Sequence, residues 1–113
     1  AMTWVSERNL VAAISNAGAF GVLACGSMSP HLLRDEIRAT RALTPLPFGV
    51  NLILLHPQLD ALAQTCVEEN VPVVVLAGGV PKAALVAALT QGGVRVMAFA
   101  PALAVARKFV KMG

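Results

Sequence analysis

Aromatic and charged residues are scarce in this chain of 113 amino acids, and tyrosine is absent. Aromatic residues make up 4% of the chain and charged residues 13%, whereas hydrophobic residues make up 57%. This composition excludes a disordered chain and disfavours an aromatic-rich binding surface. Alanine, valine and leucine dominate, so the sequence predicts one domain in which helices pack on strands, an α/β fold.

Blocks of like charge and long hydrophobic runs are also missing. The formal net charge is +3, but its Lys and Arg residues are scattered, so we expect no nucleic-acid partner. The apolar run from Val71 stops at Pro81, well short of the roughly 20 residues of a membrane-spanning helix. The N-terminus also lacks a signal-peptide pattern, and we therefore expect a cytoplasmic protein without membrane contact.

Cysteine is limited to two residues, Cys25 and Cys66, and neither belongs to a CxxC motif or a Cys/His cluster. The sequence thus predicts no metal site. Cys25 lies in a strand pattern and Cys66 on the apolar face of a helix pattern, so both are expected to be buried, reduced thiols.

Apolar, β-branched runs recur along the chain, with helical patterns between them. The predicted strands are Ala19–Ala24, Phe48–Leu55, Val71–Ala77 and Val94–Ala100. Each run is apolar on both faces, which is typical of parallel strands covered by helices. The sequence therefore predicts successive parallel strand–helix units.

Helix boundaries are marked by proline, serine and glycine. The predicted first helical residues are Pro30, Pro57, Pro81 and Pro101, the predicted N-caps are Ser6 and Ser29, and the predicted stops are Gly18, Gly92, Gly93 and Gly113. The clearest helix has an apolar stripe of Leu59, Leu62, Ala63, Cys66 and Val67.

The strand spacing is compact but compatible with a (β/α)8 barrel, of which only half is present. The chain starts directly before its first helix, as though the preceding strand had been cut at its C-terminal end. We expect residues 1–113 to form a single partial barrel domain, from the end of strand 1 through helix 5. We also expect the sequence to be a piece of a longer polypeptide, although a natural fragment and a deliberate truncation remain alternatives.

Asn51 is the one polar residue in the apolar segment Pro47–Leu55. A buried amide without hydrogen bonds costs about 1–3 kcal/mol, so Asn51 needs a partner. That partner is either neighbouring backbone or a bound polar ligand, and the residue pattern leaves both open.

Five segments together resemble the nitronate monooxygenase family, formerly called 2-nitropropane dioxygenases, which includes flavin-dependent enoyl-acyl-carrier-protein reductases. The segments are Met2–Ser6, Ser15–Leu23, Pro47–Leu52, Val71–Val75 and Gly93–Met97, the last followed by Ala104–Ala106. The resemblance runs the length of the chain and implies the N-terminal half of a TIM barrel that binds FMN at the C-terminal ends of its strands.

The resemblance also implies cofactor-contacting residues. Met2 and Thr3 would lie at the end of the first strand, and Asn51 matches an FMN-contacting asparagine. Gly78 and Gly79 follow the predicted strand Val71–Ala77, which corresponds to the fourth strand of the family's barrel. Either a cofactor approaches the backbone there, or a plain tight turn precedes Pro81. Cys25-Gly26 has the same ambiguity with less support.

Several positions depart from the family pattern. Ala1 replaces a usual glycine, and the segment Leu76–Gly79 differs from the glycine-rich sequence usual there. Phe99 is apolar where some monooxygenases have a polar residue, which favours the reductase-like branch. The family's catalytic histidine follows the sixth strand, which this sequence does not contain, so we predict no catalytic residue here.

Neither histidine of the chain matches that catalytic position. His31 is expected to be solvated. His56 follows a predicted strand on the presumed active-site face and is expected to cap a helix or to be exposed.

Two functions are compatible with these observations. The first is a fragment of an FMN-dependent oxidoreductase, inactive alone, whose family substrates are alkyl nitronates or enoyl thioesters, with NAD(P)H as an electron donor. The alternative is a non-catalytic half-barrel module that forms a homo-oligomer or pairs with a missing C-terminal half, because open sheet edges associate.

Overall fold

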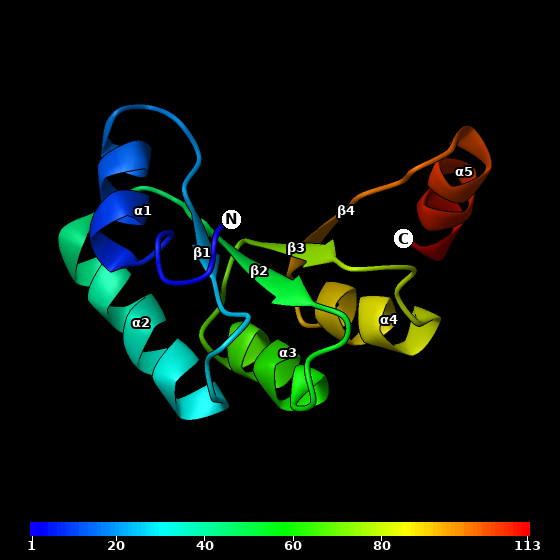
Figure 1. Cartoon of the computed structure of the whole chain (residues 1–113), viewed down its shortest axis with the longest axis horizontal. Coiled ribbons are helices and arrows are strands. Elements are labelled where there is room, and N and C mark those ends of the chain that lie inside the picture. Colours follow the sequence, from blue (N-terminus) through cyan, green and yellow to red (C-terminus); the bar gives the residue numbers. More distant parts are fainter.

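The computed structural model describes all 113 residues, in which helices and strands alternate throughout (Figure 1). The helices are α1 (Arg8–Asn16), α2 (Pro30–Leu43), α3 (Leu59–Glu68), α4 (Ala83–Gln91) and α5 (Leu103–Met112); the strands are β1 (Val22–Ala24), β2 (Gly49–Ile53), β3 (Val73–Ala77) and β4 (Arg95–Ala98). The strands form one parallel sheet in the order β1-β2-β3-β4. This confirms the predicted α/β architecture of parallel strand–helix units.

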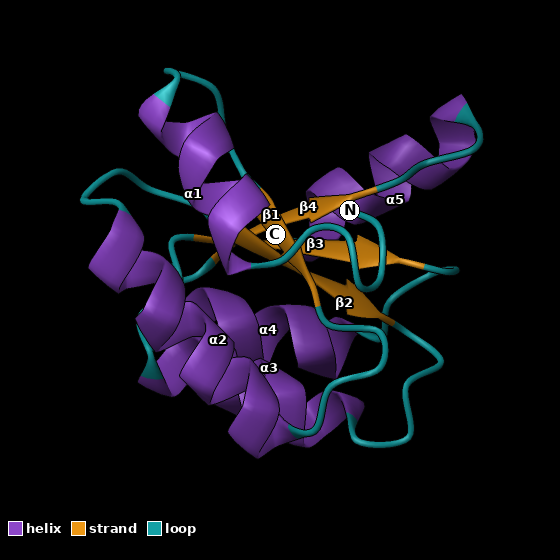
Figure 2. Ribbon diagram, turned by 60° about the vertical axis from the view of Figure 1, so that its left-hand side comes forward, coloured by secondary structure: helices purple, strands orange, loops and turns teal.

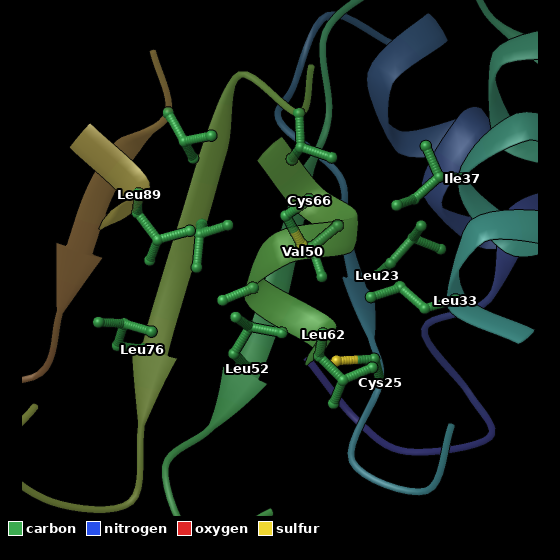
Figure 3. Packing of buried hydrophobic residues seen from close by; sticks show 14 of the residues in the cluster. Leu23, Cys25, Leu33, Ile37, Val50, Leu52, Leu62, Cys66, Leu76 and Leu89 are labelled. Atoms are coloured by element: carbon green, nitrogen blue, oxygen red, sulfur yellow. The ribbon is translucent and has the colours of Figure 1, made fainter. Parts of the chain in front are cut away.

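The core lies on one side of this sheet. Helices α2, α3 and α4 all lie on that side (Figure 2). Side chains from the sheet and these helices pack together there with exposures of 0–1% (Figure 3); among them are Leu23, Val50, Leu52 and Leu76 from the strands and Leu33, Leu62 and Leu89 from the helices. Burial of these side chains stabilises the fold by about 1.5–3 kcal/mol each.

The opposite side of the sheet, which we call the inner face, carries the alternate residues of each strand. Ala24, Asn51, Val75 and Met97 form one row across it, because the parallel register pairs them in that order. Met97 is 58% exposed, and along β4 exposed and half-buried residues alternate. β4 lies at the sheet edge, and the helix that follows it, α5, has no buried residue.

The strands begin later than predicted because the residue at three predicted starts closes the preceding helix instead. Each donates its backbone N–H to a carbonyl in the last turn of that helix, and the residue before it has a positive φ. The pairs are Ala19 with Gly18, Val71 with Asn70, and Val94 with Gly93. This Schellman arrangement confirms Gly18 and Gly93 as helix stops and adds Asn70, which the sequence pattern did not single out.

The helix starts are confirmed only for α2. Ser29 Oγ accepts a hydrogen bond from the Leu32 N–H at 3.2 Å, and Pro30 is the first helical residue. Pro57, Pro81 and Pro101 each lie two residues before the first helical residue, so their prediction as first residues is wrong.

The predicted N-cap Ser6 is also wrong, because Glu7 caps α1. Its carboxylate accepts hydrogen bonds from the Asn9 and Leu10 N–H groups at 3.1 and 3.0 Å. These hydrogen bonds, first of all the one from Asn9, lower the pKa of Glu7. Ser6 Oγ instead accepts from the Met2 N–H at 2.9 Å.

Buried carboxylates join the first three helices. Glu36 of α2 accepts hydrogen bonds from the Arg8 N–H and guanidinium at 2.7 and 2.6 Å, which ties the start of α1 to α2. Glu69, directly after α3, pairs with Arg38 and Arg41 of α2. None of the five helices has the length and hydropathy needed to span a membrane, and no group of three His, Cys, Asp or Glu residues could hold a metal ion.

Candidate functional site

The carboxyl ends of the strands meet at one edge of the sheet, which the N-terminal loop also reaches. A Cβ atom placed on Gly26, just after β1, would lie 3.1 Å from Thr3 Oγ1 and 2.6 Å from Ile53 Cδ1. A Cβ on Gly78, just after β3, would lie 3.6 Å from Ile53 Cγ2. Thr3, Gly26, Ile53 and Gly78 thus form a continuous row that we call the carboxyl edge, the edge at which barrel enzymes bind their ligands.

Asn51 lies one row below Ile53 on the inner face and is 8% exposed. Its Nδ2 donates a hydrogen bond to the Val75 carbonyl at 2.9 Å, so the local structural partner that the sequence left open is present. Its Oδ1 accepts no hydrogen bond from the protein, and it is not sealed from solvent. Asn51 therefore retains a free acceptor on the inner face.

The N-terminal loop holds Met2 at the carboxyl edge. The Met2 N–H donates to Ser6 Oγ, and the Met2 carbonyl accepts from the Val5 and Ser6 N–H groups at 3.1 and 2.8 Å. Trp4 has a positive φ of 64°, a conformation that is strained for a bulky residue. Because its backbone groups are engaged in the loop, Met2 offers a ligand mainly its side chain, which is 63% exposed.

Gly78 and Gly79 have φ values of 92° and 137°, so both need the conformational freedom of glycine. A Cβ on Gly79 would meet no atom within 4 Å, so the chain itself does not fill the space above this residue. The plain-turn and ligand-approach interpretations therefore both remain, but packing against the protein is not the reason for glycine at position 79.

His31 matches its prediction, whereas His56 neither caps a helix nor is exposed. His31 is exposed, and its Nδ1 lies 3.1 Å from an Asp35 carboxylate oxygen on the same helix. His56 is half-buried, and its Nδ1 accepts a hydrogen bond from the Gln58 N–H at 3.0 Å just before α3. His31 has one titratable partner, Asp35, on the exposed surface of α2, and His56 has none, so neither belongs to a buried acid–base pair.

Both cysteines are buried free thiols, as predicted. Burial raises the pKa of Cys25 to about 12 and raises that of Cys66 further. Cys25 Sγ donates to the Asn51 backbone carbonyl at 2.9 Å. These protonated thiols are structural, because only the thiolate is a nucleophile or a metal ligand.

The residues that the sequence proposed for this edge are Met2, Thr3, Asn51, Gly78 and Gly79, and the sequence did not reveal the contacts that support them. Ser6 as the anchor of Met2, and the Val75 carbonyl as the partner of Asn51, depend on contacts between distant segments or within an irregular loop. A serine four residues after Met2 is the only sequence signal for the first, and nothing in the sequence identifies the second.

A parallel sheet of consecutive strand–helix units in the order β1-β2-β3-β4 is an α/β arrangement of the kind found in TIM barrels. The family model named nitronate monooxygenase matches residues 1–103. The chain therefore belongs to the nitronate monooxygenase family.

One related protein matches nearly the whole chain, and another matches just over half of it. A protein of Rhodococcus jostii (strain RHA1), named (3aS,4S,5R,7aS)-5-hydroxy-7a-methyl-1-oxo-octahydro-1H-indene-4-carboxyl-CoA dehydrogenase, is 35% identical over 112 residues, which are 99% of this chain and 31% of that protein. The nitronate monooxygenase of Paraburkholderia phytofirmans (strain DSM 17436 / LMG 22146 / PsJN) is 44% identical over 64 residues, 56% of this chain and 18% of that protein.

Solved structures agree with this assignment. FabK from Thermotoga maritima superimposes with a TM-score of 0.95 and 38% identity, over 99% of this chain and 36% of FabK. Nitroalkane oxidase from Streptomyces ansochromogenes gives a TM-score of 0.88 and 28% identity, over 99% of this chain and 42% of that chain. The chain thus spans less than half the length of the relatives it matches.

Proposed function

We propose that this chain supplies part of the flavin site of an FMN-dependent oxidoreductase. The observation that supports this most is Asn51, which is 8% exposed yet keeps an unpartnered Oδ1 just below the carboxyl edge. This acceptor is not sealed by the protein, so it is open to a hydrogen-bond donor of a ligand on the inner face. FMN, when bound, accepts and donates the electrons of the reaction.

The other residues at the carboxyl edge fit this cofactor. Asn51 offers an acceptor and one remaining N–H, which complement the mixed donors and acceptors of a flavin ring. Gly78 and Gly79 leave their backbone accessible, and Met2 offers an exposed, polarisable side chain. Thr3 brings a hydroxyl to the same edge.

This chain is proposed to hold flavin without turning substrate over by itself. A general base must reach its proton with a supporting group behind it. His31 contacts only Asp35 at the surface, and His56 uses its Nδ1 for the turn before α3. Full activity of the 113-residue chain with stoichiometric FMN would contradict this part of the proposal.

An acyl thioester is the proposed substrate class, in preference to an alkyl nitronate. The support is the relative from Rhodococcus jostii, which covers 99% of this chain and carries a carboxyl-CoA dehydrogenase name. Phe99, 69% exposed at the end of β4, adds an apolar surface near the edge. NAD(P)H is the proposed electron donor if the reaction is a reduction.

A second candidate is a half-barrel module that associates with a copy of itself or with further barrel units. It is favoured by α5, which buries none of its residues, and by β4, whose inner-face residue Met97 is 58% exposed. A monomeric mass in sedimentation that does not change with protein concentration would contradict this candidate. Flavin absorbance tests the flavin proposal separately.

The experiment that tests the flavin proposal is titration of the chain with FMN, followed by flavin absorbance and fluorescence, for the wild type, Asn51→Leu and the exposed control Asn9→Leu. Asn51→Leu should weaken FMN binding about tenfold, because one amide contact is worth about 1–1.5 kcal/mol. Its free energy of unfolding should change by less than about 1 kcal/mol, since leucine burial offsets the lost bond to Val75. Equal FMN affinity in all three proteins would overturn the proposal.

A further inference from the structure

A cleft of about 790 Å³ lies beside the carboxyl edge, between the loops that follow β2 and β3 and the first turns of α3 and α4. Its apolar lining includes Leu54, Leu59, Val80 and Leu85. Gly78 lines it as well, so the cleft adjoins the residues proposed to hold the flavin. Its volume lies in the range of about 300–1,000 Å³ that is typical of small-molecule sites.

His56 and Lys82 give this cleft a free hydrogen-bond donor and an unpaired positive charge. His56 Nδ1 accepts the Gln58 N–H, so the neutral imidazole carries its proton on Nε2 and keeps that donor for another partner. Lys82, on the loop before α4, lines the cleft and forms no ion pair. Asp60, in the first turn of α3, also lines the cleft without an ion pair, so a bound anion is favoured only near Lys82.

We propose that this cleft binds the phosphopantetheine arm of the acyl thioester; this inference rests on the proposed function, which places the flavin at the adjoining edge. The apolar lining accommodates the methyl and methylene groups of the arm. His56 Nε2 donates a hydrogen bond to an amide carbonyl of the arm, and Lys82 binds its phosphate. An amphipathic arm of this kind matches an apolar cleft that has one unpaired cation and one oriented donor.

The test is calorimetric titration of the chain with coenzyme A and with pantetheine, which has the same arm but no phosphate. Lys82→Met should weaken coenzyme A binding about tenfold and leave pantetheine binding unchanged, because only the phosphate contact is lost. The matched control Lys108→Met removes an exposed, unpaired lysine of α5 and should change the affinity less than about twofold. His56→Phe, which retains an aromatic ring, should weaken both ligands about threefold by removing the Nε2 donor.

Several results would overturn this inference. These are absence of coenzyme A binding at millimolar concentration, equal losses in Lys82→Met and Lys108→Met, and equally tight, equally Lys82-dependent binding of NADH, which would indicate a general nucleotide site. FMN titration of the same samples separates the two proposals. FMN binding without coenzyme A binding contradicts the cleft alone, whereas Lys82-dependent coenzyme A binding without FMN binding contradicts the flavin site alone.

Discussion

Helices end near the amino ends of the parallel strands and begin near their carboxyl ends, and these two sets of helix termini are capped differently. At the amino ends, where helices finish and strands begin, the backbone of Ala19, Val71 and Val94 closes three helices with hydrogen bonds. At the carboxyl ends, α3, α4 and α5 begin without a side-chain cap, whereas Glu7 caps α1 and Ser29 caps α2. The chain satisfies its own polar groups at the amino ends and leaves more of them available at the carboxyl edge.

Three glycines, at positions 21, 92 and 79, also differ in how closely they are packed. A Cβ on Gly21, before β1, would lie 2.4 Å from the Val11 carbonyl oxygen, and one on Gly92 would lie 2.6 Å from Val67 Cγ1. A Cβ on Gly79, at the carboxyl edge, would meet nothing within 4 Å. Packing therefore requires glycine at positions 21 and 92 of the amino ends, whereas position 79 at the carboxyl edge has open space.

This comparison indicates where stability and binding are located. In TIM barrels the amino-terminal face mainly serves stability and the carboxyl-terminal face carries the chemistry. In the present chain, Gly21, Gly92 and the Glu69 ion pairs lie at the amino ends, and the free Asn51 acceptor lies toward the carboxyl edge, where the flavin site is proposed.

The largest expected effect is on stability and comes from replacing glycines on either side of β1. Gly21→Ala should lower the free energy of unfolding by about 3 kcal/mol, because the new methyl group overlaps the rigid backbone of Val11. Gly26→Ala should cost about 1 kcal/mol or less, because its nearest neighbour is the flexible end of Ile53. Urea unfolding followed by circular dichroism measures both, and equal losses would remove the distinction between the two ends.

The second-largest expected effect is a loss of unfolding free energy in acid, where the ion pairs of Glu69 at the amino ends weaken. Hydrogen bonds from Arg38, followed by the charges of Arg38, Arg34 and Arg41, hold the pKa of Glu69 below its ordinary value of 4.5 against the opposing effect of burial. Because the folded-state pKa is lowered, this contribution is fully present above pH 4.5 and is lost as the pH falls through the lowered value. We expect Glu69 to contribute about 1 kcal/mol to the free energy of unfolding, because its arginine partners are partly exposed and screened by solvent.

The measurement for this second prediction is the free energy of unfolding of the wild type and Glu69→Gln between about pH 7 and pH 3. The wild type should lose more stability over this range than the variant does. Parallel curves for the two proteins would show that Glu69 contributes nothing that depends on its charge.

The alternation of apolar runs and helical stripes was sufficient to predict parallel strand–helix units, because such a pattern has few solutions. The family was predicted separately, from the five segments that resemble it. The sequence was insufficient for strand starts. Val71 and Val94 are β-branched and apolar, which is typical of a strand, yet the backbone of each is used to close a helix. Capping bonds of this kind depend on the left-handed residue before them, and at Asn70 that signal is weaker than at a glycine.

The candidate site could be predicted by residue but not by role. The sequence identified Asn51 as needing a partner, and the structure supplies one partner for Nδ2 and none for Oδ1. The division between the two atoms depends on the register of β2 with β3, which the apolar pattern does not specify to one residue. The sequence analysis did not single out Lys82, because an isolated lysine after a proline forms no distinguishing pattern. Only the structure shows that it lines a cleft.

The smallest expected effect is also the most direct test of the comparison between the two ends, because it uses two glycines with similar local conformations. Gly79 and Gly93 both have positive φ values, 137° and 82°, and a Cβ placed on either would meet no atom within 4 Å. Alanine at either position should cost about 1 kcal/mol of unfolding free energy, since a left-handed backbone is strained for any residue with a Cβ. Only Gly79→Ala should weaken FMN binding, by about threefold, because only Gly79 lies at the carboxyl edge. If flavin titration shows equal FMN affinities for these two variants, the open space at Gly79 serves a turn and not a ligand.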